Sequence, residues 1–412
     1  MLDKTSHLLP AVEKLREQFY LSRKQSIDLI RNLSSEDCQA QSMEDASPAK
    51  WHLAHITWLY EVMVLKPFEK NFAYWNSEFA VLFNSYYNGI GDKHPRSKRG
   101  LLTRPSLKEV LEWRKNIEAR VYALLEEKTS PELLWLIKLG INHEQQHQEL
   151  LLTDIQHLFS NNSLFPVYYS DLKQPSAVEK SFKWIQGIDG LVKIGHADDE
   201  FYFDNEGPKH SVLNQVHSIA NRLVSNSEWL QFINDGGYQD YRWWLDAGWA
   251  WLQAEKISSP LYWSKDSQNK MFRFSLYGNS PLDMHEPVSN ISYFEADAFA
   301  RWASHNIPEL AGARLPTEFE WETFAKSNSK VDYDLFDKVW QWTSSNYTAY
   351  PGYQPWAGIA GEYNGKFMVN QMVLRGSSAY TASGHSRATY RNFLPTNARW
   401  QMSGLRLAKD GI

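Results

Sequence analysis

The first 160 residues are patterned as long amphipathic helices, and the sequence beyond about residue 180 is patterned differently. Over residues 11–32, apolar side chains recur at helical spacing with charged residues between them. Residues 190–195 and 371–376 are instead short apolar runs, separated from their neighbours by Gly, Asn, Asp and Pro, which is typical of short strands and irregular loops. This change predicts an all-helical part followed by an α+β part.

Three further helices are indicated by residues that commonly start a helix. Ser47-Pro48 predicts an N-cap with proline at the first helical position, Ser106 and Glu109 have capping-box spacing, and Ser130-Pro131 predicts another start. These helices should end near residues 65, 128 and 159. We therefore expect a four-helix bundle over 1–165, a linker over 166–180 and an α+β domain over 181–412. The crossover 66–105 is long for a compact bundle, which favours a functional role.

Composition excludes several classes of function. Hydrophobic residues make up 43% of the chain and the formal net charge is -5, so the chain can form real cores but offers no basic excess for nucleic acid. No long apolar run predicts a membrane span, and the first 20 residues lack the pattern of a secretory signal, so we expect a cytoplasmic protein. The single cysteine, Cys38, excludes intramolecular disulfides and cysteine-rich zinc sites. A metal would be held by His, Asp or Glu.

The clearest chemical motif places two histidines one turn apart on a predicted helix. His143 and His147 are four positions apart, so both imidazoles lie on one face and can bind the same ion. His55 lies among apolar residues on another predicted helix and could be a third ligand, although a buried histidine is more often a core residue. The pair also fits the HExxH motif of zinc peptidases, with Glu144 as base, but no downstream third-ligand motif follows.

Six segments, taken together, resemble one family over nearly the whole chain. They are SPAKWHLAHITW, VLFNSYYNGIGDKHPRSKRGLL, NHEQQHQELLLTDI, GARLPTEFEWE, VWQWTSS and RATYRNFLPTNARWQMSGLRLAKD, in that order. The sequence resembles the iron(II)-dependent sulfoxide synthases of ergothioneine biosynthesis, the hercynine oxygenases. The resemblance implies a DinB-like four-helix bundle joined to a domain of the formylglycine-generating-enzyme type, a variant of the C-type lectin fold. It also implies an oxygen-dependent enzyme that joins cysteine or γ-glutamylcysteine to the imidazole C2 of Nα-trimethylhistidine (hercynine) as a sulfoxide.

The same resemblance implies roles for individual residues. The iron ligands would be His55, His143 and His147, which leave three open positions and the full charge of Fe(II) for a thiolate substrate. Either Tyr86 or Tyr87 would donate a proton or a hydrogen bond to oxygen, and without that donor the thiol would be oxidised to a sulfinate.

Substrate-binding roles are implied for residues in both parts of the chain, so the active site is expected between the two domains. Gln146 would hydrogen-bond the substrate imidazole, and Arg96 with Arg99 would bind the carboxylate of the thiol substrate. Near the C-terminus, Asn392 and Phe393 would contact hercynine, with the aromatic ring facing its quaternary ammonium group.

One loop departs from the family pattern, so some alternatives stay open. Many relatives read RGGSCAT where residues 375–381 read RGSSAYT, which leaves the sulfur donor undefined and keeps a selenium donor, as in selenoneine-forming relatives, as an alternative. A non-catalytic protein that binds a metal or a small molecule is the other alternative. The tyrosines and arginines of residues 86–99 favour an enzyme, because a protein that only sequesters a metal does not need them.

Overall fold

The computed structural model describes residues 8–128, 130–197 and 200–411, and the chain forms two compact units. The first unit contains Met1–Tyr168 together with two short segments from late in the sequence, Trp356–Tyr363 and Ala382–His385. The second contains the remaining residues from Tyr169 onward. The boundaries expected at residues 165 and 181 stay a prediction, and a linear division does not anticipate the two late segments of the first unit.

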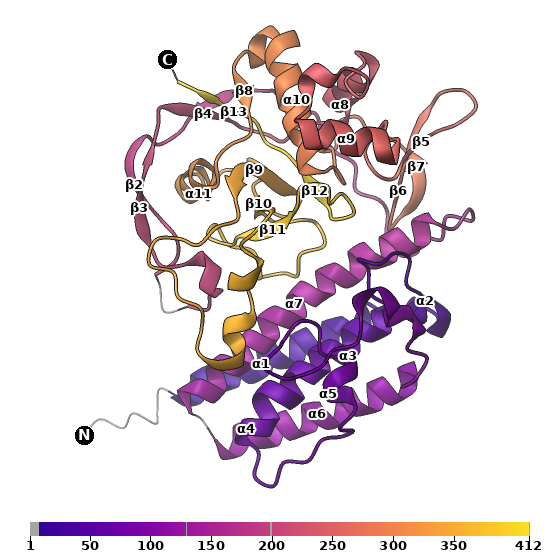
Figure 1. Ribbon diagram of the computed structural model, residues 1–412, viewed down its shortest axis with the longest axis vertical. Helices are drawn as coiled ribbons and strands as arrows, with labels where there is room; N and C mark the ends of the chain where they lie inside the picture. Colours follow the sequence, from indigo (N-terminus) through magenta and orange to yellow (C-terminus); the bar gives the residue numbers. More distant parts are fainter. Residues whose placement is uncertain (1–7, 129, 198–199, 412) are drawn as a thin grey trace. The chain divides into compact units, whose positions relative to one another are not determined.

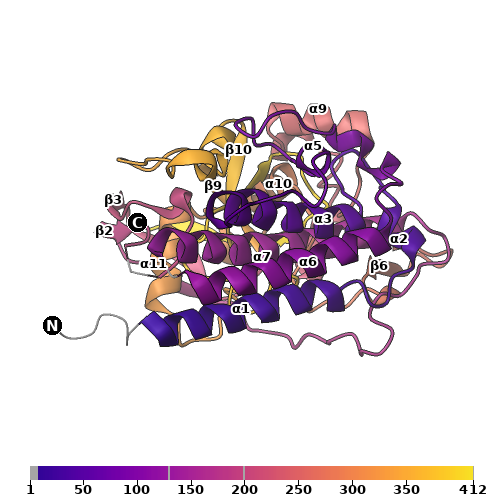
Figure 2. The same ribbon diagram turned by 90° about the horizontal axis from the view of Figure 1, so that it is seen from below.

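The first unit is built on four long helical segments. In Figures 1 and 2, α1, α3, α6 and α7 lie alongside one another, and α7 packs against both α1 and α3 while α6 packs against α3. Every residue of α3 is buried, so this helix forms the centre of the unit. The helical segments are α1 (Leu8–Asp28), α2 (Ser35–Gln39), α3 (Ala49–Leu59), the π-helix η1 (Tyr60–Leu65), α4 (Lys66–Phe68), α5 (Phe79–Leu82), the 3₁₀ helix η2 (Arg96–Leu101), α6 (Leu107–Glu127) and α7 (Pro131–Ser160).

Local sequence determines most of these helix starts. The predicted capping box of Ser106 and Glu109 is present at the start of α6, and the Ser130 hydroxyl accepts a hydrogen bond from the Leu133 amide at the start of α7. The expectation for Ser47 is wrong by one position, because Pro48 is the N-cap and α3 begins at Ala49. Ser47 instead anchors the chain: its amide donates to Asp154 Oδ2 at 2.8 Å.

The helix that follows Ser47 is also less regular than expected. It was predicted to run unbroken to about residue 65, but after Leu59 it continues as the π-helix η1. Tyr60, the first residue of η1, lies against Gly140 of α7, where an added Cβ would fall 2.4 Å from the tyrosine ring. A side chain at position 140 would therefore push these two helices apart.

Among the described residues, the second unit combines small sheets with four α-helices and several short 3₁₀ helices. One sheet has the order β1-β4-β13-β8, a second has the order β11-β10-β9-β12, and the remaining strands form the ribbons β2-β3 and β5-β6-β7. The strands are β1 (Trp184–Gln186), β2 (Gly190–Ile194), β3 (His210–Asn214), β4 (His217–Ala220), β5 (Trp263–Lys265), β6 (Met271–Ser275), β7 (Gly278–Pro281), β8 (Ala313–Arg314), β9 (Trp340–Asn346), β10 (Gln371–Gly376), β11 (Asn392–Pro395), β12 (Ser403–Gly404) and β13 (Ala408–Asp410). The α-helices are α8 (Asn226–Asn234), α9 (Asp246–Glu255), α10 (Tyr293–Asn306) and α11 (Glu318–Ser327).

The expected strands at 190–195 and 371–376 are confirmed as β2 and β10. In the core of this unit, buried aromatic side chains surround a network of buried ions. The Arg375 guanidinium is fully buried and pairs with Glu322 at 2.7 Å, while Arg391 pairs with Glu318 at 2.8 Å. Because each buried charge has a partner, the network is compatible with a dry core.

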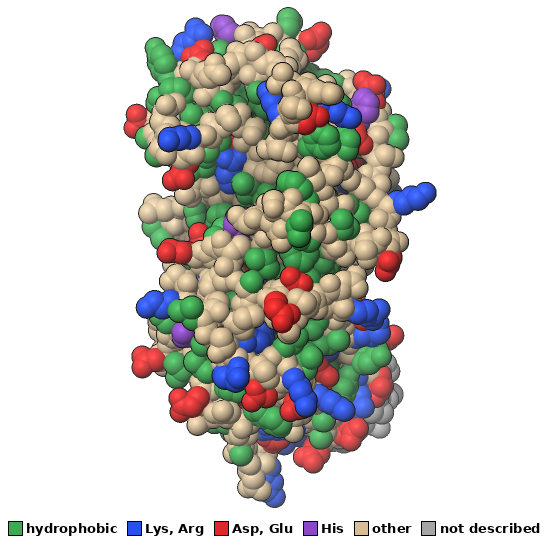
Figure 3. Space-filling model, turned by 90° about the vertical axis from the view of Figure 1, so that its right-hand side faces the viewer, with side chains coloured by type: hydrophobic (Ala, Val, Ile, Leu, Met, Phe, Trp, Pro, Cys, Tyr) green, Lys and Arg blue, Asp and Glu red, His purple; other side chains and the backbone are tan. Residues whose placement is uncertain are grey.

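The surface carries charges of both signs. On the described face shown in Figure 3, Lys and Arg side chains are interspersed with Asp and Glu, as expected from the small net charge. Among the described residues, no helix has the length and apolar character that a membrane span requires.

Candidate metal centre

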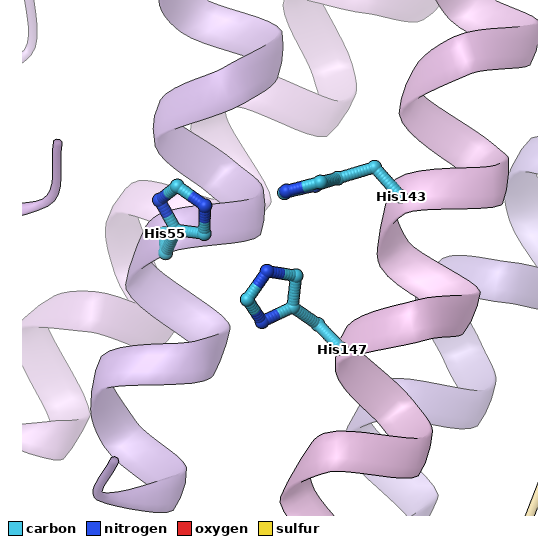
Figure 4. Close-up of side chains that lie close together, drawn as sticks. All are labelled: His55, His143 and His147. Carbon is cyan, nitrogen blue, oxygen red and sulfur yellow. The ribbon is translucent and has the colours of Figure 1, made fainter. Parts of the chain in front are cut away.

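Three histidines from two helices converge inside the first unit. His55 lies on α3, and His143 and His147 lie one turn apart on α7 (Figure 4). One ring nitrogen from each histidine falls within 4.8 Å of the others. His55 and His143 are buried and His147 is partly buried. The structure therefore brings together the three histidines that the sequence indicated, in a geometry suited to one metal ion.

The ring of His55 is fixed on both faces and at one nitrogen. It stacks on Trp51 with 4.7 Å between centroids and on Trp58 with 5.3 Å, so it is held between two indoles one turn before and one turn after it. Its Nδ1 lies 2.6 Å from the Phe83 carbonyl oxygen. A carbonyl oxygen can only accept, so Nδ1 carries the proton and the lone pair lies on Nε2, which is 3.5 Å from Ser85 Oγ.

Unlike the ring of His55, the ring of His143 is not held by a hydrogen bond to any described residue. It is 2% exposed, and neither of its ring nitrogens has a hydrogen-bond partner among the described residues. Burial lowers its pKa to about 3, so the ring is neutral at physiological pH. A buried, neutral ring with an unsatisfied lone pair is costly unless something binds it. A divalent metal ion between the three rings would satisfy that lone pair, so the residues present fit such an ion.

The other two histidines are neutral as well. Burial, followed by the neighbouring His143, lowers the pKa of His55 and of His147 well below the ordinary value. Three neutral imidazoles are the form in which histidine binds a metal. Proton competition for the site is therefore weak near neutral pH.

His147 is supported by a second pair of residues. Its Nδ1 lies 2.8 Å from Nδ1 of His52, and Nε2 of His52 lies 3.0 Å from Asp154 Oδ2. His52 is on α3, one turn before His55, and Asp154 is on α7, two turns after His147. Sequence reasoning did not single out either residue, because a histidine and an aspartate on separate helices show no local pattern.

Glu144 points away from the three histidines. Its carboxylate accepts hydrogen bonds from Arg23 at 3.2 Å, from Ser26 at 2.6 Å and from Arg114. Burial alone would raise the pKa of Glu144, but Arg114 and Arg23 hold it below the usual value. A carboxylate held between two buried arginines cannot serve as the base of an HExxH peptidase, so the geometry opposes that alternative.

Residues 83–87 form the part of the long crossover closest to His55. The Asn84 side chain organises the loop, because its Nδ2 donates to the carbonyl oxygens of Tyr87, Gly91 and Asp92. Tyr86 and Tyr87 stack with 4.5 Å between centroids, and their hydroxyl oxygens are 3.4 Å apart. Burial, with Tyr86 and Tyr363 nearby, raises the pKa of Tyr87 well above its usual range. Tyr87 therefore stays protonated.

A third tyrosine, which sequence reasoning missed, belongs to the same unit. Tyr363 lies in the late segment Trp356–Tyr363, and its hydroxyl donates to Gln146 Oε1. Its ring meets that of His143 edge-on, with 5.8 Å between centroids. In the same segment, Glu362 accepts hydrogen bonds from the amides of Asn88 and Gly89. The only sequence signal was the aromatic-rich stretch before residue 363.

The two crossover arginines have separate partners. The Arg99 guanidinium lies 3.4 Å from the centroid of Trp51 and donates to Ser47 Oγ at 2.9 Å. Burial, with Arg96 nearby, lowers the pKa of Arg99 to about 9. Arg96 is exposed and donates to the Asp45 carbonyl oxygen. The two guanidinium groups are not held by one common acceptor in this structure.

Asn392 and Phe393 lie in the second unit, on β11. The Phe393 ring stacks on Tyr347 with 4.0 Å between centroids and 11° between planes. Asn392 Oδ1 accepts a hydrogen bond from the Phe393 amide. Phe393 thus belongs to an aromatic cluster with Tyr347 and Phe367, and the expected role of Asn392 and Phe393 in substrate binding stays a prediction.

Comparisons with known proteins agree with this two-part architecture. Residues 18–151 match the DinB superfamily, and residues 173–335 match the sulfatase-modifying factor enzyme 1-like domain. The chain thus combines a DinB-type helical bundle with a domain of the sulfatase-modifying-factor type, and the predicted fold is confirmed.

Two relatives that match nearly the whole chain are both named hercynine oxygenase. Hercynine oxygenase from Mycolicibacterium thermoresistibile is 27% identical, over 98% of this chain and 97% of that protein. Hercynine oxygenase from Mycolicibacterium smegmatis is 27% identical, over 97% of this chain and 99% of that protein. Ergothioneine biosynthesis protein 1 from Schizosaccharomyces pombe is 26% identical, over 52% of this chain and 29% of that protein. This chain is therefore similar to hercynine oxygenases over nearly its whole length.

Proposed function

We propose that this protein is an Fe(II)- and O₂-dependent sulfoxide synthase that joins a thiol to the imidazole C2 of hercynine. The observation that carries the proposal is the buried cluster of His55, His143 and His147, in which the unsatisfied nitrogens of His143 call for a metal ion. The full-length match to hercynine oxygenases supports the reaction, and the neutral nitrogen donor set is compatible with Fe(II). We further propose that the reaction takes place in the cytoplasm.

The reaction balances without an external reductant. Hercynine loses the hydrogen on C2, the thiol loses its sulfur hydrogen, and a C–S bond forms between the two substrates. One oxygen atom of O₂ is transferred to sulfur, and the other leaves as water with the two hydrogens. Bound Fe(II) would supply the site at which O₂ and the thiolate meet.

The charge of the protein ligands suits an anionic sulfur donor. His55, His143 and His147 are all neutral donors, and Glu144 is neutralised by its own arginines. The positive charge of a divalent ion would therefore be left for the substrate, which favours binding of the thiol as a thiolate.

The tyrosine pair supplies the proton that directs the outcome. Tyr87 is fully buried and stays protonated, and the Tyr86 hydroxyl lies within reach of its hydroxyl. A protonated phenol in a site from which water is largely excluded can donate a hydrogen bond or a proton but does not act as a base. We assign this donor role to the pair, and its loss would leave oxidation of sulfur alone as the competing reaction.

Substrate recognition is assigned to five residues. Gln146 would bind the imidazole of hercynine, and Arg96 and Arg99 would bind the carboxylate of the thiol. Asn392 and Phe393 would bind the trimethylammonium end of hercynine. The Tyr363 hydroxyl donates to the oxygen of the Gln146 amide and so fixes the orientation of that amide. Arg96 is exposed and would exchange its hydrogen bond to the Asp45 carbonyl oxygen for a carboxylate, whereas Arg99 is held on Trp51.

The test is a reconstitution under anaerobic conditions. Purified protein is loaded with Fe(II), mixed with hercynine and either cysteine or γ-glutamylcysteine, and exposed to O₂, and the products are identified by mass spectrometry. We expect a sulfoxide adduct and consumption of one O₂ per adduct. No O₂ uptake with any thiol or selenol would overturn the proposal, and uptake only with a selenium donor would assign the chain to C–Se bond formation.

A further inference from the structure

A chain of hydrogen bonds connects a buried carboxylate to one of the three candidate ligands. It runs from Asp154 through His52 to His147, with 3.0 Å between Asp154 Oδ2 and His52 Nε2 and 2.8 Å between the two histidine Nδ1 atoms. Neither Asp154 nor His52 belongs to the candidate metal site itself. The chemistry of each atom in the chain determines where the protons are.

The direction of the hydrogen bonds follows from the two ends. Asp154 Oδ2 also accepts the Ser47 amide at 2.8 Å, so this oxygen acts as an acceptor and the His52 Nε2 must donate to it. With Nε2 of His52 as the donor to Asp154, its Nδ1 is the acceptor for Nδ1–H of His147. The only nitrogen of His147 left with a lone pair is Nε2.

The three histidines consequently differ in their support. The Phe83 carbonyl oxygen fixes His55, and the His52–Asp154 pair fixes His147. His143 has no hydrogen-bond partner at either nitrogen among the described residues. Two of the rings are thus preorganised before any ion binds, and the third is not.

We propose that His52 and Asp154 are positioning residues that hold His147 in the tautomer whose Nε2 binds the metal. The inference rests on the proposed function, because it assigns support to the metal site proposed there. A hydrogen bond from the ligand ring to an acceptor also raises the basicity of the ligating nitrogen, and removal of such partners commonly weakens metal binding by about 10–100-fold.

Two substitutions separate hydrogen-bond acceptance from packing. His52→Leu introduces an apolar side chain of similar size and removes the Nδ1 acceptor. His52→Asn places a carbonyl oxygen near the position of Nδ1, and this oxygen can still accept a hydrogen bond from His147. His157→Leu is the matched control, because His157 is a histidine of the same unit but its Nδ1 contacts Ser42 Oγ, away from the three ligands.

The readout is the dissociation constant for Co(II), measured by titration of metal-free full-length protein and followed by the visible absorption of the bound ion. We expect the constant to rise about 10–100-fold in His52→Leu and to stay within about threefold of wild type in His52→Asn and in His157→Leu. Unchanged binding in His52→Leu, or equal losses in both His52 variants, would overturn the inference while leaving the metal site in place. Wild-type protein that binds no Co(II) would overturn both proposals.

A measurement on the wild-type protein keeps the inference testable even where a variant fails to fold. In metal-free protein labelled with ¹⁵N-histidine, long-range ¹H–¹⁵N correlation reports which nitrogen of each ring carries the proton. We expect His147 to be protonated at Nδ1 and bare at Nε2, and the reverse tautomer would overturn the inference.

Discussion

Replacement of His143 by leucine should abolish metal binding and, at the same time, stabilise the metal-free protein. His143 is fully enclosed, and both of its ring nitrogens lack hydrogen-bond partners among the described residues. Burial of an unsatisfied polar group costs about 1–3 kcal/mol, and leucine removes that cost at similar volume. We therefore expect the free energy of unfolding of the metal-free protein to rise by about 1–3 kcal/mol.

Urea denaturation of metal-free protein, followed by tryptophan fluorescence, measures this difference. At a slope of about 2 kcal/mol per molar urea, the midpoint should increase by about 0.5–1.5 M. Added metal at about 100 times its dissociation constant should stabilise the wild type by about 2.7 kcal/mol and leave the variant unchanged.

A matched variant on the same helix gives the opposite expectation. His157 has a hydrogen bond to Ser42 at 2.7 Å, so His157→Leu should lose about 0.5–1.5 kcal/mol and keep its metal. If His143→Leu destabilises the metal-free protein as His157→Leu does, or if it binds metal with wild-type stoichiometry, the argument that the site is built around an ion is refuted.

Three further predictions concern other parts of the same unit. Glu144→Gln should lower the free energy of unfolding by about 3–5 kcal/mol, because two buried arginines lose their counter-charge. The variant should still bind metal with wild-type stoichiometry. Loss of metal without loss of stability would contradict this prediction. As pH falls from about 6.5 to about 3, His143 should lower the free energy of unfolding of the metal-free protein by about 1.4 kcal/mol per pH unit, because only the unfolded state binds a proton at this residue. This dependence of stability on pH should be weaker in His143→Leu. Tyr87→Phe or Tyr86→Phe should shift the product toward the sulfinate of the thiol, as measured by mass spectrometry, and unchanged ratios in both variants would remove the tyrosine assignment.

Sequence alone predicted those parts of the fold that local chemistry determines. The starts of α6 and α7 follow from Ser106 with Glu109 and from Ser130, and β2 and β10 follow from short apolar runs between turn residues. The prediction that Ser47 is an N-cap was wrong, because a serine near the start of a helix can also hold the chain in place through hydrogen bonds to other helices. Its amide and hydroxyl are engaged by Asp154 and Arg99, which are distant in sequence, and no local pattern reveals such contacts.

Some residues of the candidate site could likewise be predicted from local sequence, and others could not. The pair His143 and His147 has helical spacing and could be found by inspection, and His55 was found by the same reasoning together with the family resemblance. Tyr363 was missed because it lies 217 residues from its partner Gln146. His52 was missed for a different reason: its spacing from His55 is visible, but its function depends on Asp154 across the helix interface.

The two faces of α7 explain why one helix can carry both a metal ligand set and a buried carboxylate. Glu144 follows His143 by one position, which turns it about 100° around the helix, toward Arg23 and Arg114. Its charge is balanced there, so Glu144 adds no uncompensated negative charge to the histidine face. A divalent ion bound by three neutral imidazoles would keep its full charge, and an anionic substrate would be the nearest group able to balance it. With a metal ion bound at the proposed site, the separation of charge on α7 would make metal binding and thiolate binding mutually supportive.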